Sequence, residues 1–388
     1  MVTLGIEQLC VTRPDFLKGK RLALLCNQAS TDRHFTHSRD LVNAAFPGQL
    51  TCLFSPQHGF FAEKQDNMIE SDHRIEPQSG RTIYSLYGAT RKPTPEMMAG
   101  LDALLIDLVD VGTRVYTFAQ TTAYCLEAAA AAGVDVVILD RPNPIGGAEV
   151  EGHVLQPDCA SFVGLFPIPM RHGLTLGELA RFMADRLPDT PRPEVIAAAG
   201  WRREMYFPGT GLPWVPPSPN MPTPETAWVY PGQVLWEGTN VSEGRGTTRP
   251  FHVCGAPFID PYALRDDLAS AGIEGAVFRP TSFEPTFHKF RGEVCHGVEI
   301  HPIDPRTFRP CLTSLTILES ILRRWPDRFS FRPPPYEYEY ERQPIDLILG
   351  DRRVREGLLA GRSARDIAGE GDEGVAAFLE AREKCLLY

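Results

Sequence analysis

Several features that mark common protein classes are absent from this sequence of 388 residues. Its nine cysteines are odd in number and form no C-x-x-C pair, so neither a disulfide framework nor a cysteine zinc site is indicated. No apolar run is long enough to span a bilayer, and Glu7 and Asp15 interrupt the N-terminal stretch where a secretory signal needs continuous apolar residues. These absences predict a soluble protein of the reducing cytoplasm.

Long basic runs are absent as well. The chain has 39 Lys and Arg residues against 49 Asp and Glu residues, which gives a net charge of -10 with histidine neutral. Nucleic acid and anionic membranes attract proteins through clustered positive charge. The charge balance therefore predicts that neither of them is a partner.

The motifs of nucleotide binding and of nucleophilic hydrolysis are also missing. A dinucleotide site needs G-x-G-x-x-G directly after the first strand, but the sequence there reads LCNQASTDRH and contains no glycine. There is no Walker A loop and no G-x-S-x-G elbow. We therefore expect no nucleotide, and indeed no cofactor, and no serine-hydrolase chemistry.

What the first half of the chain does contain is a regular alternation of short apolar runs with helical patterns. Continuous apolar runs of this length are typical of parallel strands that are covered on both faces. The alternation predicts an α/β domain whose mainly parallel sheet resembles a dinucleotide fold without its cofactor loop. The expected strands are residues 21–26, 50–54, 103–108 and 134–139, and the expected helices are residues 37–46, 94–101, 117–132 and 175–187.

The segment from residue 207 to residue 236 is dense in proline. Proline removes a backbone donor and clashes within a helix, so we expect neither a helix nor a central strand to continue through this segment. We interpret it as the crossing between two domains, residues 1–225 and residues 226–388. The second domain is expected to be α+β, with helices near residues 313–325 and within residues 345–387.

Polar residues follow each of the four expected strands. In open α/β sheets the loops after the strands converge on one edge, which is where ligands bind. Taken singly, each residue has a structural explanation, such as a turn at Asp140 or an ion pair at Arg114. Together they predict a site. They are Asn27 after the first strand, Gln57, His58 and Glu63 after the second, Asp110, Arg114 and Tyr116 after the third, and Asp140, Asn143 and Glu151 after the fourth.

The stretch EGTNVSEGRGTTRPF, residues 237–251, brings two more carboxylates, Glu237 and Glu243, close to Arg245. Its glycines permit a close approach of the backbone to a ligand, although a solvated connector would have the same composition. Carboxylates beside amide and hydroxyl donors are the groups that glycoside hydrolysis uses. The composition of the two regions therefore favours a sugar-binding cleft.

Eight strings follow one another along the chain: PQHGF, DLVDVGTRVYTF, DRPNPIGG, VEG, RHGLTLGELA, PSPNMPT, YPGQVLWEGTNVSEGRGTTRPF and GAPF. In this order they resemble the NamZ-type exo-β-N-acetylmuramidases, which are bacterial peptidoglycan hexosaminidases. The likeness covers nearly the whole chain and is strongest from about residue 103 to residue 258. It implies removal of N-acetylmuramic acid (MurNAc) from non-reducing ends of peptidoglycan fragments. It also implies a Rossmann-like N-terminal domain, a smaller C-terminal domain and an active site in the cleft between them.

One position departs from the family. Its members commonly have a glutamate, regarded as catalytic, where this chain has Gln57. An amide cannot protonate a leaving group, so Glu63 or Glu70 on the same loop could supply the acid, or the substrate or the activity differs. Gln57 could instead orient the 2-acetamido group, whose carbonyl oxygen can act as nucleophile. We expect Glu63 and Glu151 to be the best-placed carboxylates, acting with Gln57 and His58.

The other candidates bind substrate in this interpretation. Arg114, Arg245 or His172 could accept the lactyl carboxylate of MurNAc, because a planar guanidinium suits a carboxylate. We expect neither a metal site nor a fixed oligomeric state beyond monomer or homodimer. The expected substrate-binding residues are Asn27, Asp110, Arg114, Tyr116, Asp140, Asn143, His172, Asn220, Glu237, Asn240, Glu243 and Arg245.

Two other functions stay open. A protein that kept the cleft but lost the acid at position 57 would bind an amino sugar or a muropeptide without cleaving it. Alternatively, His58 with Asp107 and Asp110 could hold the metal of a metal-dependent hydrolase. A cytoplasmic muramidase would meet recycled wall fragments instead of the intact wall.

Overall fold

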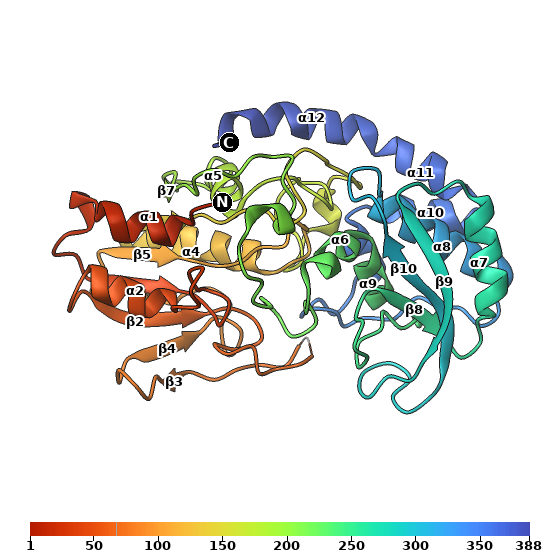
Figure 1. The fold of residues 1–388 in the computed structure, drawn as a ribbon, viewed down its shortest axis with the longest axis horizontal. Helices are drawn as coiled ribbons and strands as arrows, with labels where there is room; N and C mark the ends of the chain where they lie inside the picture. The colour runs from red at the N-terminus through yellow and green to blue at the C-terminus, as the bar shows by residue number, and fades with distance from the viewer. Residues whose placement is uncertain (67) are drawn as a thin grey trace.

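The computed structural model describes residues 1–66 and 68–388, which form two domains, each built around its own sheet (Figure 1). The first sheet has the strand order β3-β4-β2-β1-β5-β6-β7, and its neighbours are parallel except for β3 and β4. This confirms the predicted α/β fold with a mainly parallel sheet. The strands are β1 (Leu22–Leu25), β2 (Leu50–Ser55), β3 (Arg74–Ile75), β4 (Thr82–Ser85), β5 (Ala103–Ile106), β6 (Asp135–Leu139) and β7 (Glu194–Ile196).

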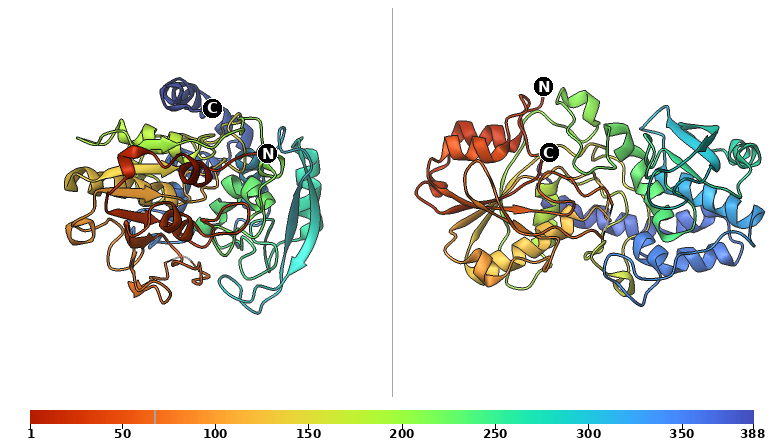
Figure 2. Two further views of the ribbon diagram at one scale, coloured as in Figure 1. Left: turned by 60° about the vertical axis from the view of Figure 1, so that its left-hand side comes forward. Right: turned by 90° about the horizontal axis from the view of Figure 1, so that it is seen from below.

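Helices cover both faces of this sheet, as the apolar runs predicted (Figure 2). Side chains alternate along a strand, so Leu22 and Leu24 join one core while Ala23 and Leu25 join the other. The first core also contains side chains of α1 and α2, and the second contains those of α4 and α5. The helices of this domain are α1 (Gly5–Thr12), α2 (Ser38–Ala45), α3 (Pro95–Met98), α4 (Phe118–Ala132) and α5 (Leu176–Ala184), with short 3₁₀ turns at Asp15–Leu17, Pro157–Cys159 and Phe207–Thr210.

The strand order reverses at one point of the sheet, between β1 and β5. From β1 the chain builds outward through β2 and β4, then returns to β5 on the other side of β1 and continues to β6 and β7. Such a reversal opens a crevice beyond the carboxyl ends of the strands. The loops after β1, β2, β5 and β6 therefore converge at the edge where the sequence predicted a site.

The proline-dense segment was interpreted wrongly in one respect, because it contains the helix α6 (Pro224–Gln233). Pro224 occupies the first turn, where a missing N–H is no loss, and its fixed φ suits the helix. Pro231 lies in the last turn, just before the 3₁₀ turn Val234–Gly238. The prolines therefore mark the two ends of a helix where we expected none.

The second domain confirms the expected α+β class. Its antiparallel sheet has the order β8-β10-β9, and α7 packs against β9 and β10. The helix expected at residues 313–325 is α8, which contacts α6 and α7. The elements are β8 (Val253–Ala256), α7 (Pro261–Ser270), β9 (Ala276–Phe283), β10 (Cys295–Pro302), α8 (Pro310–Arg324), α9 (Pro344–Leu349), α10 (Arg352–Leu359), α11 (Ala364–Glu370), α12 (Asp372–Arg382) and a 3₁₀ turn at Glu383–Cys385.

The end of the chain returns to the first domain. Helix α12 runs back from the second domain, and the two termini lie near each other (Figure 1). Arg382 donates to the carbonyl of Gly147 at 3.2 Å, and the Tyr388 hydroxyl donates to Asp140 at 2.8 Å. A division of the sequence after residue 225 stays a prediction, and the last residues of the second part pack on the first. Within residues 1–66 and 68–388, every helix is too short or too polar to cross a bilayer.

Candidate active site

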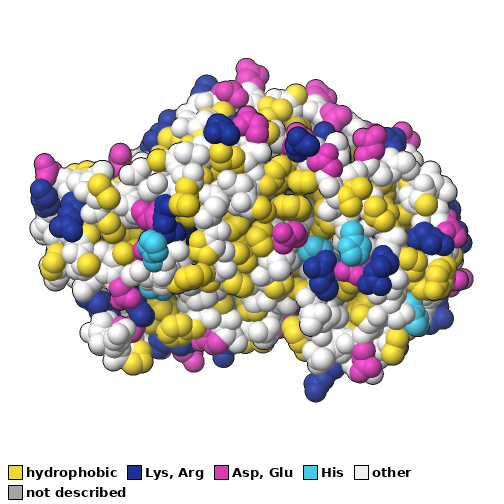
Figure 3. All heavy atoms as spheres, viewed as in Figure 1, with side chains coloured by type: hydrophobic (Ala, Val, Ile, Leu, Met, Phe, Trp, Pro, Cys, Tyr) yellow, Lys and Arg dark blue, Asp and Glu magenta, His cyan; other side chains and the backbone are white. Residues whose placement is uncertain are grey.

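A cavity lies where the loops after β2 and β5 meet the second domain. Figure 3 shows the seam between the domains, where a central apolar band adjoins acidic, basic and histidine side chains. The first domain supplies Gln57, His58, Val115, Tyr116, Thr117, Phe118, Val163, Ser218, Asn220 and Met221, and the second supplies Tyr230, Glu237, Arg245, Phe251, Tyr336 and Glu337.

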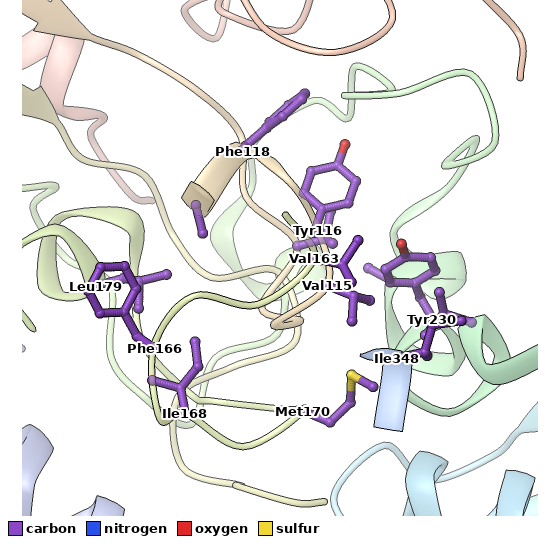
Figure 4. Close-up of a cluster of buried hydrophobic side chains, with 14 of the residues drawn as sticks. Val115, Tyr116, Phe118, Val163, Phe166, Ile168, Met170, Leu179, Tyr230 and Ile348 are labelled. Atoms are coloured by element: carbon purple, nitrogen blue, oxygen red, sulfur yellow. The ribbon is translucent and has the colours of Figure 1, made fainter. Parts of the chain in front are cut away.

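One wall of the cavity is apolar with polar tips. In Figure 4, Tyr116 lies above Val115 and Val163, Tyr230 lies to their right, and both tyrosine hydroxyl groups point toward the top of the view. The rings of Tyr116 and Tyr230 meet edge to face at 6.1 Å. Aromatic rings that bear hydroxyl groups can pack against a sugar and donate hydrogen bonds to it.

Gln57 is held between the two domains. Its Oε1 accepts a hydrogen bond from the Thr117 hydroxyl at 2.5 Å, and its Nε2 donates to Glu337 Oε1 at 3.2 Å. Because a hydroxyl donates to one end of the amide and a carboxyl oxygen accepts from the other, the orientation of the amide is defined. Gln57 is buried and can therefore position the carboxyl group of Glu337.

His58 adopts a left-handed backbone conformation, with φ of 72°, and its Nδ1 lies 2.8 Å from the carbonyl oxygen of Lys64. A carbonyl can only accept, so Nδ1 carries the proton and Nε2 is an acceptor in the neutral ring. Burial, together with the nearby charge of Arg245, lowers the pKa of His58 to about 4, and the hydrogen bond to the Lys64 carbonyl opposes this shift. The ring is therefore neutral at pH 7.

Glu337 is the carboxylate that the sequence reasoning missed. It lies on a two-residue turn in which Tyr336 and Glu339 exchange backbone hydrogen bonds at 2.9 Å. Glu337 and Tyr338 have φ of 44° and 67°, which is the left-handed region that glycine or asparagine usually occupies in such turns. The only sequence signal was the alternation YEYEYE after three prolines.

The surroundings of Glu337 favour its protonated form. Burial raises the pKa of its carboxyl group to about 7, and the charge of Glu237 also raises it. Hydrogen bonds from the Tyr87 hydroxyl, at 2.6 Å, and from Gln57 oppose this rise. Glu337 can therefore hold or release a proton near neutral pH.

Glu237 has a different environment in the same cavity. Arg245 Nη2 donates to its Oε1 at 2.6 Å, and the Tyr336 hydroxyl donates to its Oε2 at 2.7 Å. Burial lowers the pKa of Arg245, but Glu237 and Glu243 raise it above its ordinary value. The guanidinium therefore stays charged and stabilises a carboxylate at Glu237.

Lys289, in the loop between β9 and β10, binds the start of the stretch 237–251 and the residue before it. Lys289 Nζ donates to the carbonyls of Trp236 and Val241 and, at 2.8 Å, to Glu243 Oε2. His288 Nδ1 lies 3.1 Å from Glu243 Oε1. Glu243 is fully buried in this network and holds the loop that carries Arg245.

Comparison with known proteins decides the family. Residues 22–225 match the family model described as exo-beta-N-acetylmuramidase NamZ, N-terminal, and residues 228–388 match its C-terminal counterpart. The chain belongs to the NamZ exo-β-N-acetylmuramidase family.

Individual relatives agree with this assignment. The peptidoglycan β-N-acetylmuramidase NamZ of Bacillus subtilis strain 168 is 41% identical over 387 residues, which cover 100% of this chain and 91% of that protein. A crystal structure of a DUF1343 family protein from Bacteroides fragilis superposes with a TM-score of 0.89 at 31% identity. A second DUF1343 protein from that organism has a TM-score of 0.76 at 29% identity. Each match covers 100% of this chain and 99% of the other.

Six of the predicted site residues of this NamZ-family chain line the cavity, namely Gln57, His58, Tyr116, Asn220, Glu237 and Arg245. Glu243 lies directly behind them, within 3.3 Å of Arg245 Nε. Residues predicted from the strand ends and residues of the 237–251 stretch therefore lie in one site. Residues from two domains, distant in sequence, form a single polar group there.

The two glutamates that we expected to be catalytic lie outside this cavity. Glu63 is exposed and pairs with Arg74 on the surface. Glu151 Oε1 accepts the backbone N–H of Leu312 at 2.9 Å, so it caps the first turn of α8. Their predicted catalytic role is not supported by contact with the cavity.

Several other predicted residues hold the framework together. Arg114 donates to the carbonyls of His153, Ile168 and Ile348, which joins the two domains. The remaining residues have local partners: Asn27 donates to Pro217, Asp140 accepts from Thr175, Gly177 and Tyr388, Asn143 bonds Leu174 and Ile145, and Asn240 bonds Arg328 and Ser330.

Asp110 and His172 form a separate buried pair, with Asp110 Oδ2 3.7 Å from His172 Nε2. Burial raises the pKa of Asp110 to about 7 and lowers that of His172 to about 3. Among the described residues, no three His, Cys, Asp or Glu side chains lie close enough together to hold a metal ion. The grouping of His58 with Asp107 and Asp110 is therefore not found.

Proposed function

We propose that this NamZ-family chain is a glycosidase that removes MurNAc from the non-reducing ends of peptidoglycan fragments. The observation that carries the proposal is the buried cavity between the domains, in which Glu337 and Glu237 have different surroundings. Glycosidases use two carboxyl groups, one protonated and one ionised, on either side of the bond that breaks. Membership of the family supports the same activity.

The charge of the cavity supports MurNAc as that sugar. MurNAc differs from N-acetylglucosamine by a lactyl carboxylate, which needs a cationic partner. Of the three side chains predicted to accept it, Arg245 lines the cavity, whereas Arg114 is committed to backbone carbonyls and His172 is fully buried. We propose that Arg245 binds the lactyl carboxylate.

The reaction that fits this arrangement uses the acetamido group of the substrate. As the C1–O bond breaks, its electron pair stays on the departing oxygen, which takes a proton from an acid. The acetamido carbonyl oxygen forms a bond to C1 and gives a positively charged ring. The Glu237 carboxylate stabilises that charge. Water then adds to C1 and returns its proton to the acid, which restores the acetamido group.

Hydrolysis of a chromogenic N-acetylmuramide tests the proposal, with the matching N-acetylglucosaminide as control. We expect turnover of the muramide that survives a chelator, at least 100-fold above turnover of the glucosaminide. Binding of MurNAc without turnover of any muramide would show a sugar-binding protein instead. Loss of turnover with the chelator would show a metal-dependent hydrolase.

A further inference from the structure

Position 57 leaves the reaction without its expected acid. The Gln57 side chain cannot donate a proton to a glycosidic oxygen, and both predicted substitutes, Glu63 and Glu151, lie outside the cavity. A protonated group must therefore come from elsewhere among the residues that line it. Apart from Glu237, which is bound to Arg245, the carboxyl group in the lining is that of Glu337.

We propose that Glu337 is the catalytic acid, and that Gln57 positions it by holding one of its oxygens. The assignment rests on the proposed muramidase function. It places the acid on the second domain, on the turn Tyr336–Glu339, and not on the loop after β2. Active-site assembly then requires the two domains to be docked.

The hydrogen bonds around Glu337 support this assignment. Gln57 Nε2 donates to Oε1, and the Tyr87 hydroxyl lies 2.6 Å from Oε2. An amide nitrogen never competes for the proton of a carboxyl group, whereas a second carboxylate at this distance would share it. Gln57 therefore fixes the direction of the Glu337 side chain and leaves it a single titrating group.

The backbone of the turn supports it independently. Glu337 and Tyr338 are adjacent, neither is a glycine, and both have positive φ angles. Such conformations cluster at active sites, where the surrounding structure enforces them. Here the Arg91 guanidinium lies 3.3 Å from the centre of the Tyr338 ring, and the Tyr336 hydroxyl bonds Glu237. Both neighbours of Glu337 are thus anchored while its carboxyl group points into the site.

The two cavity carboxyl groups have hydrogen-bond partners of different charge. Glu237 faces the guanidinium of Arg245, but Glu337 faces the uncharged groups of Gln57 and Tyr87. Burial among uncharged groups, with Glu237 nearby, raises the pKa of Glu337 to about 7. Glu337 is therefore largely protonated below pH 7 and loses its proton as the pH rises above 7.

In the first step the Glu337 proton moves to the glycosidic oxygen as the C1–O bond breaks, and Glu337 becomes a carboxylate. In the second step this carboxylate takes a proton from the water that attacks C1. Glu337 ends in its starting form, so no other reactant is consumed. The second step is the same for every substrate, whereas kcat/KM reports the steps up to cleavage of the C1–O bond. In kcat/KM, a variant without the acid should therefore lose activity only where the leaving group needs the proton.

The experiment compares two substrates. One is a MurNAc-β-1,4-GlcNAc disaccharide, whose leaving group must be protonated, and the other is a 2,4-dinitrophenyl β-N-acetylmuramide, whose leaving group departs as an anion. For Glu337→Gln we expect a loss of about 10² to 10⁴ in kcat/KM on the disaccharide, the usual contribution of acid catalysis, and roughly a tenfold loss or less in kcat/KM on the dinitrophenyl substrate. The alkaline limb of the pH profile should also disappear on the second substrate.

Glu339→Gln is the matched control, because Glu339 belongs to the same turn but binds Arg342 and does not line the cavity. It should stay within a few-fold of wild type on both substrates. Retained MurNAc binding by Glu337→Gln establishes that the variant is folded. Equal losses on the two substrates, or no loss on either, would overturn the assignment. A wild-type protein that cleaves neither substrate would overturn the muramidase function itself.

Discussion

At the scale of single residues, the Gln57 side chain joins the two halves of the site. The Gln57 amide touches Glu337 at 3.2 Å and the Thr117 hydroxyl at 2.5 Å. Sequence reasoning identified Gln57 as an anomaly because the string around it is recognisable. It could not identify Glu337, because the contact joins residues 280 positions apart through a turn with no motif.

Gln57→Glu should change the pH profile of the enzyme. Two carboxyl groups at this distance cannot both ionise freely, so the pair should share a proton and one of its pKa values should rise. We expect the alkaline limb of kcat/KM to move up by about one pH unit or more, with activity retained. A profile that coincides with wild type would show that position 57 does not contact the acid. Gln65→Glu, on the exposed part of the same loop, is the control.

Asp110 gives a prediction about stability. Its pKa is about 7 in the folded chain, against an ordinary value of 3.8, because burial disfavours the charge. Between these values the folded state holds a proton that the unfolded chain has released, so stability falls as the pH rises through this window. An amide at position 110 would not titrate. Asp110→Asn should therefore gain stability relative to wild type, by roughly 2 kcal/mol or more, between pH 4 and pH 8.

Urea unfolding at the two pH values measures this difference. Asp327→Asn, at an exposed position, should show no such trend. His172 acts in the opposite direction: burial lowers its pKa, so stability is lost as the pH falls from about 6.5 toward 3. An Asp110→Asn difference that does not change with pH would contradict a protonated Asp110.

At the scale of elements, the sequence predicted those strands and helices whose residues form a local apolar or helical pattern. The central strands β1, β2, β5 and β6 are apolar runs, and α4 ends at Gly133 in a left-handed cap with φ of 66°. The short outer strands β3, β4 and β7 were missed because they are only partly buried and so form no continuous apolar run. Helix α6 was missed because its prolines occupy tolerated positions near the ends.

The loop between β9 and β10 supports the active site through Lys289. Its ammonium group satisfies two carbonyls and Glu243, all beneath the loop that carries Arg245. Lys289→Met would remove the cation that binds Glu243 Oε2 and would leave Arg245, which also pairs with Glu237, as the remaining cation. Loss of one partner from a buried ion pair costs about 3 to 5 kcal/mol. We expect a lower melting temperature and weaker MurNAc binding, measured by calorimetry. Lys384→Met, at an exposed position, is the control, and equal effects of both changes would contradict this role.

At the scale of the whole molecule, the site exists only where the two domains meet. The loops of the first sheet were predictable from its strand ends. The mode of docking was not, because it depends on contacts such as Arg114 with the Ile348 carbonyl and Tyr388 with Asp140. These partners carry no local sequence signal of their contact.

Arg114→Met tests this docking. Loss of the guanidinium leaves the carbonyls of His153, Ile168 and Ile348 without that donor, at about 1 to 3 kcal/mol for each buried group. We expect a lower unfolding free energy and a higher KM, because Glu337 and Gln57 lie on opposite sides of the seam. Arg352→Met removes an exposed arginine and should change neither quantity. An unchanged KM in Arg114→Met would separate docking from substrate binding.

The most direct test of the account is a crystal structure of Glu337→Gln with the MurNAc-β-1,4-GlcNAc disaccharide. The account predicts the MurNAc ring in the cavity between the domains, with its lactyl carboxylate on Arg245 and its glycosidic oxygen within hydrogen-bonding distance of the side chain at position 337. A disaccharide bound at another place, with the cavity free of sugar, would contradict it.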